Sequence, residues 1–184
     1  ITAAHHCHHD PMFLPDGRVM LGQCGSSQGH LAKQGVGPGD VFLFFGLFRD
    51  SADGEPHHRI FGYLKVEEVI PLAQGAPAWL AALAHPHALA MHHHNDAIYR
   101  GPGTVAARAS AALRLTVPGG PPTLWQRPSW LARGGLSYHD RADRWLPGGR
   151  LKSVARGQEF VADVGHRPAP RQWLAAVLEE IRAS

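Results

Sequence analysis

An eight-residue apolar run, VFLFFGLF at residues 41–48, places the strongest limit on how this chain can fold. Gly39 and Asp40 precede the run and a polar loop follows it, so turn signals bound it on both sides. Such a run is typical of a strand that is buried on both faces. A second run, RIFGYLKVEEVI at residues 59–70, alternates between apolar and polar side chains and predicts a neighbouring strand. Together the two runs predict an antiparallel pair.

The rest of the chain predicts short elements and one long helix. Residues 170–183 carry apolar side chains at helical spacing, which predicts a C-terminal helix. Alanine and leucine at residues 77–84 favour a shorter helix. The glycine-rich residues 22–40 are expected to form a loop with at most one short helical turn. Further short strands are expected at residues 97–100, 112–117 and 157–164.

The expected strands outnumber the helices and do not alternate with them as βαβ units do. We therefore expect an α+β fold, small and mixed, around a curved, mainly antiparallel sheet or a partial β-barrel, with a C-terminal helix. A chain of 184 residues that is 44% hydrophobic can bury one core, and no linker divides it. Residues 1–184 are expected to form a single domain.

The composition favours a cytoplasmic protein without a membrane partner. No apolar run approaches the roughly 20 residues that a membrane helix needs, and the first residues lack the pattern of a secretory signal. Two cysteines, Cys7 and Cys24, are too few to crosslink a chain of this size, which favours a reducing compartment. The chain begins with Ile1 rather than Met, so we expect the natural N-terminus to lie upstream.

A group of potential metal ligands and acid/base residues, HHCHHDP, occupies residues 5–11. In extended backbone, residues two apart face the same side, so His6, His8 and Asp10 share one face. One interpretation makes His8 a general acid/base that Asp10 orients. A second interpretation is a metal site formed by His6, His8 and Asp10. The third is a solvated, histidine-rich chain end. The leading prediction assigns no metal ligands and leaves the cofactor open, with a divalent metal as the alternative.

Basic and aromatic residues are interleaved in the second half of the chain. Between Arg100 and Arg156 there are ten Lys/Arg and two acidic residues, together with tryptophan and tyrosine. Cations neutralise phosphates and flat side chains stack on bases, the two components of binding to single strands or flipped bases. The rival interpretation is a core that uses tryptophan, with arginines around it. The residues predicted to bind nucleic acid are Arg108, Arg114, Trp125, Arg127 and Trp130.

Six separated stretches are familiar when taken together in their order. They are CHHDP at 7–11, the block from GQCGSSQGHL to FFGLFR at 22–49, HRIFGYLKVEEVI at 58–70, HPHA at 85–88, NDAIY at 95–99 and GQEFV at 157–161. In this order they resemble the third family of nucleotide modification associated domains. The family is grouped with phage and bacterial systems that modify or process bases in DNA, so the resemblance implies DNA or a modified nucleotide as partner. A weaker similarity, in residues 39–70, is to PUA-like domains.

The resemblance also implies where the site lies. The family's Cys-His-x-Asp-Pro falls on Cys7, His8, Asp10 and Pro11, which supports His8 and Asp10 as the catalytic residues. The chain departs from the family pattern in two places. Met12 occupies a position where an acid is usual, and a Ser-Arg-Lys-Gly-Phe-Asp motif of the family has no counterpart in the chain. The residues predicted to bind substrate are Gln23, His30, His85, His87, Asn95 and Tyr99.

Three functions follow from these patterns. The leading hypothesis is an enzyme, or a component of one, that acts on modified nucleotides in DNA through the His8 and Asp10 pair. The alternatives are a reader that holds a modified base without chemistry and a metal-dependent hydrolase.

Overall fold

The computed structural model describes residues 10–51, 54–89, 93–154 and 159–184. Its chain forms two compact units. The first unit comprises Ile1–Phe42 and Leu64–Thr104, and the second comprises Leu43–Tyr63 and Val105–Ser184. Three of the strands, β3 (Val41–Phe48), β4 (His57–Lys65) and β6 (Ala97–Val105), have residues in both units, and the single domain stays a prediction.

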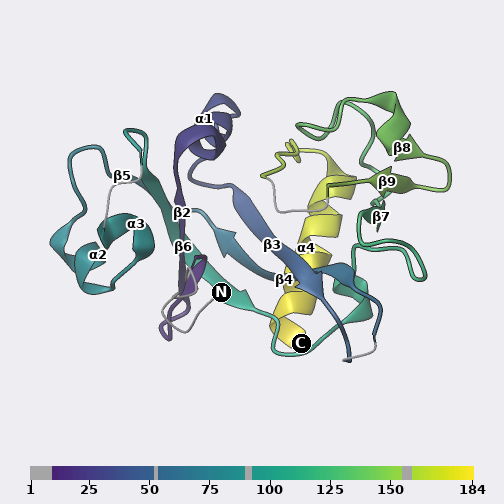
Figure 1. Cartoon of the computed structure of the whole chain (residues 1–184), viewed down its shortest axis with the longest axis horizontal. Helices are drawn as coiled ribbons and strands as arrows, with labels where there is room; N and C mark the ends of the chain where they lie inside the picture. Colours follow the sequence, from purple (N-terminus) through teal and green to yellow (C-terminus); the bar gives the residue numbers. More distant parts are fainter. Residues whose placement is uncertain (1–9, 52–53, 90–92, 155–158) are drawn as a thin grey trace. The chain divides into compact units, whose positions relative to one another are not determined.

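The first unit is built around an antiparallel sheet (Figure 1). Strand β2 lies between β1 and β6, and β5 also pairs with β6. In the β2 and β6 pair, Leu21 stands opposite Tyr99 and Gln23 opposite Ala97. The strands are β1 (Met12–Phe13), β2 (Arg18–Gln23), β5 (Glu68–Pro71) and β6 (Ala97–Val105).

Two short helices, α2 (Ala78–Ala82) and α3 (Pro86–Leu89), lie next to each other and cover part of this unit (Figure 1). Leu80 of α2 is fully buried. It packs in one apolar cluster with side chains from β2, β5 and β6, because those strands carry large apolar residues at the facing positions. The cluster consists of Met20, Ile70, Leu72, Leu80 and Ile98.

Helix α1 (Gly25–Lys33) corrects the expectation of a loop with at most one helical turn at residues 22–40. Its glycines and serines disfavour a helix, and this is why the local sequence predicts a loop. Two tertiary contacts stabilise it instead. Leu31 is buried in the core, and the buried Gln28 accepts a hydrogen bond of 3.1 Å from the hydroxyl of Tyr99. Packing of one face therefore outweighs the weak helix propensity.

The predicted strand pair at residues 41–48 and 59–70 forms β3 (Val41–Phe48) and β4 (His57–Lys65), which are hydrogen-bonded neighbours. The expectation that the first strand is buried on both faces is wrong, because Leu47 and Phe48 are exposed and only Phe44 of β3 is buried. The second run is longer than its strand. The backbone N–H of Val66 donates to the carbonyl of Asp40, which ends β4 and lets β5 begin separately at Glu68.

The second unit also contains a small sheet and the C-terminal helix α4 (Pro168–Ala183). Helix α4 buries Val177, Leu178 and Ile181, as its apolar spacing predicts. Near its end, Nε of Arg182 donates a hydrogen bond of 2.9 Å to the hydroxyl of Tyr63. The small sheet has the order β7 (Leu124–Gln126), β9 (Arg150–Lys152), β8 (Trp145–Leu146).

The predicted fold class is confirmed: antiparallel sheets and helices are mixed, and a helix ends the chain. Within the described residues, no strand pairing closes a sheet into a barrel. The prediction of a strand at residues 112–117 is wrong. Ala111–Leu113 form a 3-10 turn, and Arg114 and Thr116 make only isolated β-bridges. The described part of the strand expected at 157–164, residues 159–164, has no strand either. None of the described helices is both long and apolar enough to cross a bilayer.

Candidate functional site

A cavity of about 270 Å³ opens in the first unit where β2 ends and α1 begins. Helix α3 contributes a histidine to it, and the segment before β1 contributes an aspartate. Polar and apolar side chains share its wall, as in sites that bind small molecules. The lining residues are Asp10, Leu21, Gly22, Gln23, Cys24, Ser27 and His87.

The carboxylate of Asp10 is fixed by the backbone of β2. The Gly22 N–H faces both of its oxygens, at 3.0 Å from Oδ1 and 3.1 Å from Oδ2. Only 5% of the Asp10 side chain is exposed. A carboxylate held by a backbone donor in a nearly dry place has a defined position and a strong local field.

Two histidines face this carboxylate from the HPH stretch. Nε2 of His87 lies 3.6 Å from Oδ2 of Asp10, and Nε2 of His85 lies 3.7 Å from Oδ1. Nδ1 of His85 accepts a hydrogen bond of 3.3 Å from the backbone N–H of His87. A neutral His85 therefore carries its ring proton on Nε2, the nitrogen that faces Asp10.

The local fold brings these rings close to the sheet. The short helix expected at residues 77–84 forms α2, which ends at Ala82, and Pro86 then begins helix α3, where a missing N–H has no cost. Gly22 lets the His87 ring approach the backbone of β2. A Cβ at position 22 would lie 2.2 Å from Cδ2 of His87 and 2.9 Å from Oδ2 of Asp10.

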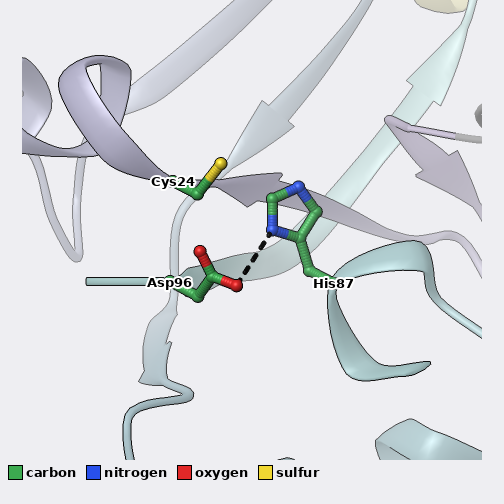
Figure 2. A group of neighbouring side chains, drawn as sticks. All are labelled: Cys24, His87 and Asp96. Atoms are coloured by element: carbon green, nitrogen blue, oxygen red, sulfur yellow. Dashed lines mark ion pairs between the residues drawn. The ribbon is translucent and has the colours of Figure 1, made fainter. Parts of the chain in front are cut away.

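Cys24 and Asp96 also approach His87. Figure 2 shows Cys24, His87 and Asp96 grouped together, although they come from three different segments. Nδ1 of His87 lies 3.9 Å from Oδ2 of Asp96, and the Cys24 sulfur lies close to the Asp96 carboxylate. One ligand atom from each of the three residues lies within 4.8 Å of the others, so the group has the composition and spacing to hold a metal ion.

Burial raises the pKa of the Cys24 thiol, and the negative charge and hydrogen bond of Asp96 raise it further, with a smaller contribution from Asp10. The thiol form is therefore favoured near neutral pH. These surroundings therefore do not favour Cys24 as a thiolate nucleophile.

Asn95 positions the start of α1 rather than lining the cavity. Its Oδ1 accepts the Gly25 N–H at 2.8 Å, and its Nδ2 donates to the Gly25 carbonyl, also at 2.8 Å. The amide thereby holds the backbone next to Cys24, and Asp96 follows it directly in the chain. The predicted substrate-binding role of Asn95 stays untested beside this structural role.

The structure brings several of the predicted site residues together. Asp10, Gln23 and His87 line the cavity, and His85 contacts Asp10 from a fully buried position. The predicted acid/base His8 lies outside the described residues, as does His6 of the alternative metal site. Of the three residues of that alternative metal site, the structure describes Asp10.

Two predicted substrate-binding residues lie away from the cavity lining. His30 is on α1, and Tyr99 is buried in β6 with its hydroxyl bonded to Gln28. Burial raises the pKa of Tyr99, and the bond to Gln28 offsets this only in part. Tyr99 is therefore a neutral core residue that supports α1.

The residues predicted to bind nucleic acid all belong to the second unit. Trp125 is buried, and its Nε1–H donates to Nδ1 of His58 at 2.9 Å. Nε of Arg114 donates to the carbonyl of Thr116. Of the remaining three, Arg108 is exposed, Arg127 donates to the carbonyl of Leu131, and Trp130 packs against Trp173 at a centroid distance of 5.5 Å.

Sequence reasoning did not single out Cys24, Asp96 or Gly22 as functional. The signal was present, because each lies inside a stretch used for the family resemblance, GQCGSSQGHL or NDAIY. A search of those stretches for side chains that bind metals or move protons would have found Cys24 and Asp96. The close approach at Gly22 arises from tertiary packing, which no local sequence pattern encodes.

The α+β fold thus contains a polar cavity beside a buried carboxylate and two imidazoles. The family follows from a direct comparison: the model of nucleotide modification associated domain 3 matches residues 1–163, and the chain belongs to that family. This membership links the protein to nucleotide modification. The PUA-like similarity is not found. No curated protein and no solved structure matches the chain.

Proposed function

We propose that the protein is an enzyme, or a component of one, that acts on a modified base in DNA or in a nucleotide, and that its cavity at Asp10 and His87 is the active site. One observation carries the proposal. Stretches far apart in the sequence, each of which resembles the family, supply the residues around a single cavity: CHHDP supplies Asp10, GQCGSSQ supplies Gly22 to Ser27, and HPHA supplies His87.

His87 and Asp10 have the arrangement of a general acid/base and the carboxylate that orients it. Asp10 is held by the Gly22 N–H and faces Nε2 of His87, so it fixes the ring and stabilises a proton on that nitrogen. The Asp96 carboxylate faces the opposite ring nitrogen, Nδ1. His87 can therefore carry a proton between a substrate and its two carboxylate neighbours.

His8 remains the second candidate for the acid/base, since it precedes Asp10 by two residues. The two histidines make different predictions. If His87 transfers the proton, His87→Gln abolishes turnover and His8→Gln does not. The reverse result assigns the step to His8.

The cavity suits one planar ring. Its volume of about 270 Å³ lies just below the usual range of pockets for small molecules, roughly 300–1,000 Å³. Gln23 and Ser27 line it and can donate to and accept from the edge of a base. Enzymes that act on bases in DNA hold one extruded base in such a pocket.

The test is mass spectrometry of nucleosides after incubation with DNA that contains modified bases. Asp10→Asn and His87→Gln are expected to lower turnover by about 10²- to 10⁴-fold, the usual contribution of a positioned acid/base. Asp16→Asn is the matched control, because Asp16 is exposed and, among the residues that the structure describes, pairs with Arg18 alone. Thermal unfolding of each variant separates lost chemistry from lost structure. Full turnover in folded Asp10→Asn and His87→Gln would refute the proposal.

A further inference from the structure

We propose that Cys24, His87 and Asp96 bind a divalent transition-metal ion of the zinc type, and that Asp10 orients His87 as a metal ligand. The site shares its cavity with the proposed function, on which this inference rests for its location; in the metal-bound protein His87 is a ligand in place of its acid/base role, because both of its ring nitrogens are then occupied. Metal binding can be measured without turnover, so either proposal can fail alone.

The three side chains converge from separate elements. Cys24 is the N-cap residue of α1, His87 lies in α3, and Asp96 directly precedes β6. Their ligand atoms lie within 4.8 Å of one another (Figure 2). His87 and Asp96 are almost fully buried, whereas Cys24 is half-buried on the cavity wall. An ion bound there would have its remaining coordination position toward the cavity.

The donor set selects the class of ion. Sulfur, imidazole nitrogen and carboxylate oxygen together suit zinc and its neighbours, whereas magnesium and calcium prefer oxygen ligands alone. Three protein ligands with one open position are the pattern of catalytic zinc sites, and four protein ligands are the pattern of structural sites. The cavity beside Cys24 and His87 gives the open position room for a water molecule or a substrate atom.

Asp10 supplies the second observation that points to a metal. In protein sites, a histidine that binds a metal through one nitrogen usually presents the other to a carboxylate. His87 has this arrangement, because Nδ1 faces Asp96 in the cluster while Nε2 faces Asp10 at 3.6 Å. The Gly22 N–H fixes Asp10 in turn. The ring orientation that metal binding needs is therefore already set by the backbone of β2.

The cluster is slightly wider than a loaded site. Zinc bonds of about 2.0–2.3 Å at tetrahedral angles place ligand atoms roughly 3.3–3.8 Å apart. The separation of 3.9 Å between His87 and Asp96 is close to this range, and the limit of 4.8 Å for the whole group leaves about 1 Å to close. Small side-chain rotations supply that movement, since Cys24 lies at the cavity wall.

The histidine-rich stretches could hold adventitious metal, so the test must report on one sulfur atom. The chain has two cysteines, Cys7 and Cys24, which provides a matched pair. Cobalt(II) replaces zinc in such sites and gives a charge-transfer absorption only when a thiolate binds it. The full chain is stripped with a chelator and titrated with cobalt(II), as wild type, Cys24→Ser and Cys7→Ser.

The proposal predicts a thiolate charge-transfer band that saturates at about one equivalent, disappears in Cys24→Ser and persists in Cys7→Ser. Asp10→Asn is expected to keep the band and weaken cobalt affinity by roughly 10- to 100-fold, as for other carboxylates that orient a ligating histidine. His94→Gln is the control, because His94 is exposed and outside the cluster. No band, or a band that survives Cys24→Ser, overturns the proposal, as does one lost only in Cys7→Ser.

A second measurement needs no variant, in case Cys24→Ser does not fold. Bound zinc should slow alkylation of Cys24 at least tenfold while leaving Cys7 unchanged, as peptide mass mapping of the wild-type chain can measure. Equal alkylation of Cys24 with and without saturating zinc overturns the site.

Discussion

Oδ2 of Asp10 lies 3.6 Å from Nε2 of His87, and this contact joins the first residue of the described chain to helix α3. The same carboxylate lies 3.7 Å from Nε2 of His85 and accepts the Gly22 N–H. Burying a carboxylate is costly unless donors surround it, and Asp10 has one fixed donor and two imidazoles. The arrangement therefore relies on the two histidines as much as on the aspartate.

The close approach of His87 to β2 predicts that position 22 tolerates no side chain. In Gly22→Ala, the new Cβ would overlap the His87 ring, at 2.2 Å from Cδ2, so the ring or the strand must move. We expect a loss of about 1–3 kcal/mol in the free energy of unfolding, as for other overpacked sites, together with loss of turnover. Chemical denaturation and the nucleoside assay measure the two effects.

Gly29→Ala is the matched control for this substitution. Gly29 lies inside α1, and the nearest neighbour of an added Cβ, Nδ2 of Asn95, would be 4.0 Å away. Alanine is a better helix former than glycine, so stability should stay the same or rise by up to about 1 kcal/mol. Equal destabilisation by the two substitutions would contradict the packing described for Gly22.

Removal of the Asn95 amide should disturb the start of α1. Asn95→Ala leaves the N–H and the carbonyl of Gly25 without their 2.8 Å partners, which is expected to cost roughly 1–3 kcal/mol. Cys24 precedes Gly25, so the cobalt(II) band should weaken in the same variant. Thermal unfolding and absorption spectroscopy report these effects, with His94→Ala as the exposed control. An unchanged melting temperature in Asn95→Ala would show that the amide does not hold the helix.

Stability should decrease in mild acid because of two buried histidines in the second unit. Burial lowers the pKa of His58, with help from His57, and burial also lowers the pKa of His139. The unfolded chain, with a histidine pKa of about 6.5, then binds more protons than the folded chain, so stability falls as pH drops below that value. Protonated His58 also cannot accept the Trp125 N–H.

Denaturation at pH 7.5, 6.5 and 5.5 measures this dependence. The double variant His58→Gln, His139→Gln should show a flatter pH profile than the wild type, although its stability at pH 7.5 is lower. The exposed His166→Gln is the control and should keep the wild-type slope. A wild-type stability that is constant across this range would contradict the assignment.

Trp125 is expected to stabilise the core of the second unit rather than to stack on a base. Its ring lies edge-on to Phe45 at 5.0 Å and to Phe160 at 6.0 Å between centroids. Trp125→Ala should lower the free energy of unfolding by about 3–5 kcal/mol, the range for a buried large aromatic residue. A folded variant of unchanged stability that had lost affinity for modified DNA would instead support the reader without chemistry.

Arg108 tests the proposed DNA contact separately, because it is exposed. If it meets a phosphate, Arg108→Gln should weaken DNA binding and reduce the slope of log affinity against log salt by about 1. Lys33→Gln, an exposed change in the first unit, is the control. An unchanged slope in Arg108→Gln would remove this residue from the interface.

The sequence predicted the elements whose signal is local. The apolar run at 41–48 became β3 with the same bounds, and the apolar face near the C-terminus became α4. Helix α1 was missed because glycine and serine hide it, and its stability comes from tertiary contacts of Gln28 and Leu31. Local periodicity carries no information about such contacts.

The site was predictable only in part for a similar reason. Asp10, His85 and His87 were chosen from their motifs, and the order of those motifs resembles the family. Cys24 and Asp96 are neighbours of His87 in space alone, because the β2 and β6 pairing brings their segments together. Single-sequence reasoning has no measure of that proximity.

A double-mutant cycle on turnover tests most directly the claim that Asp10 acts through His87. The rates of wild type, Asp10→Asn, His87→Gln and the double variant are compared on one modified DNA substrate. Residues that act as a unit are not additive, so the double variant should be no slower than His87→Gln alone. Two independent losses that multiply in the double variant would contradict the account.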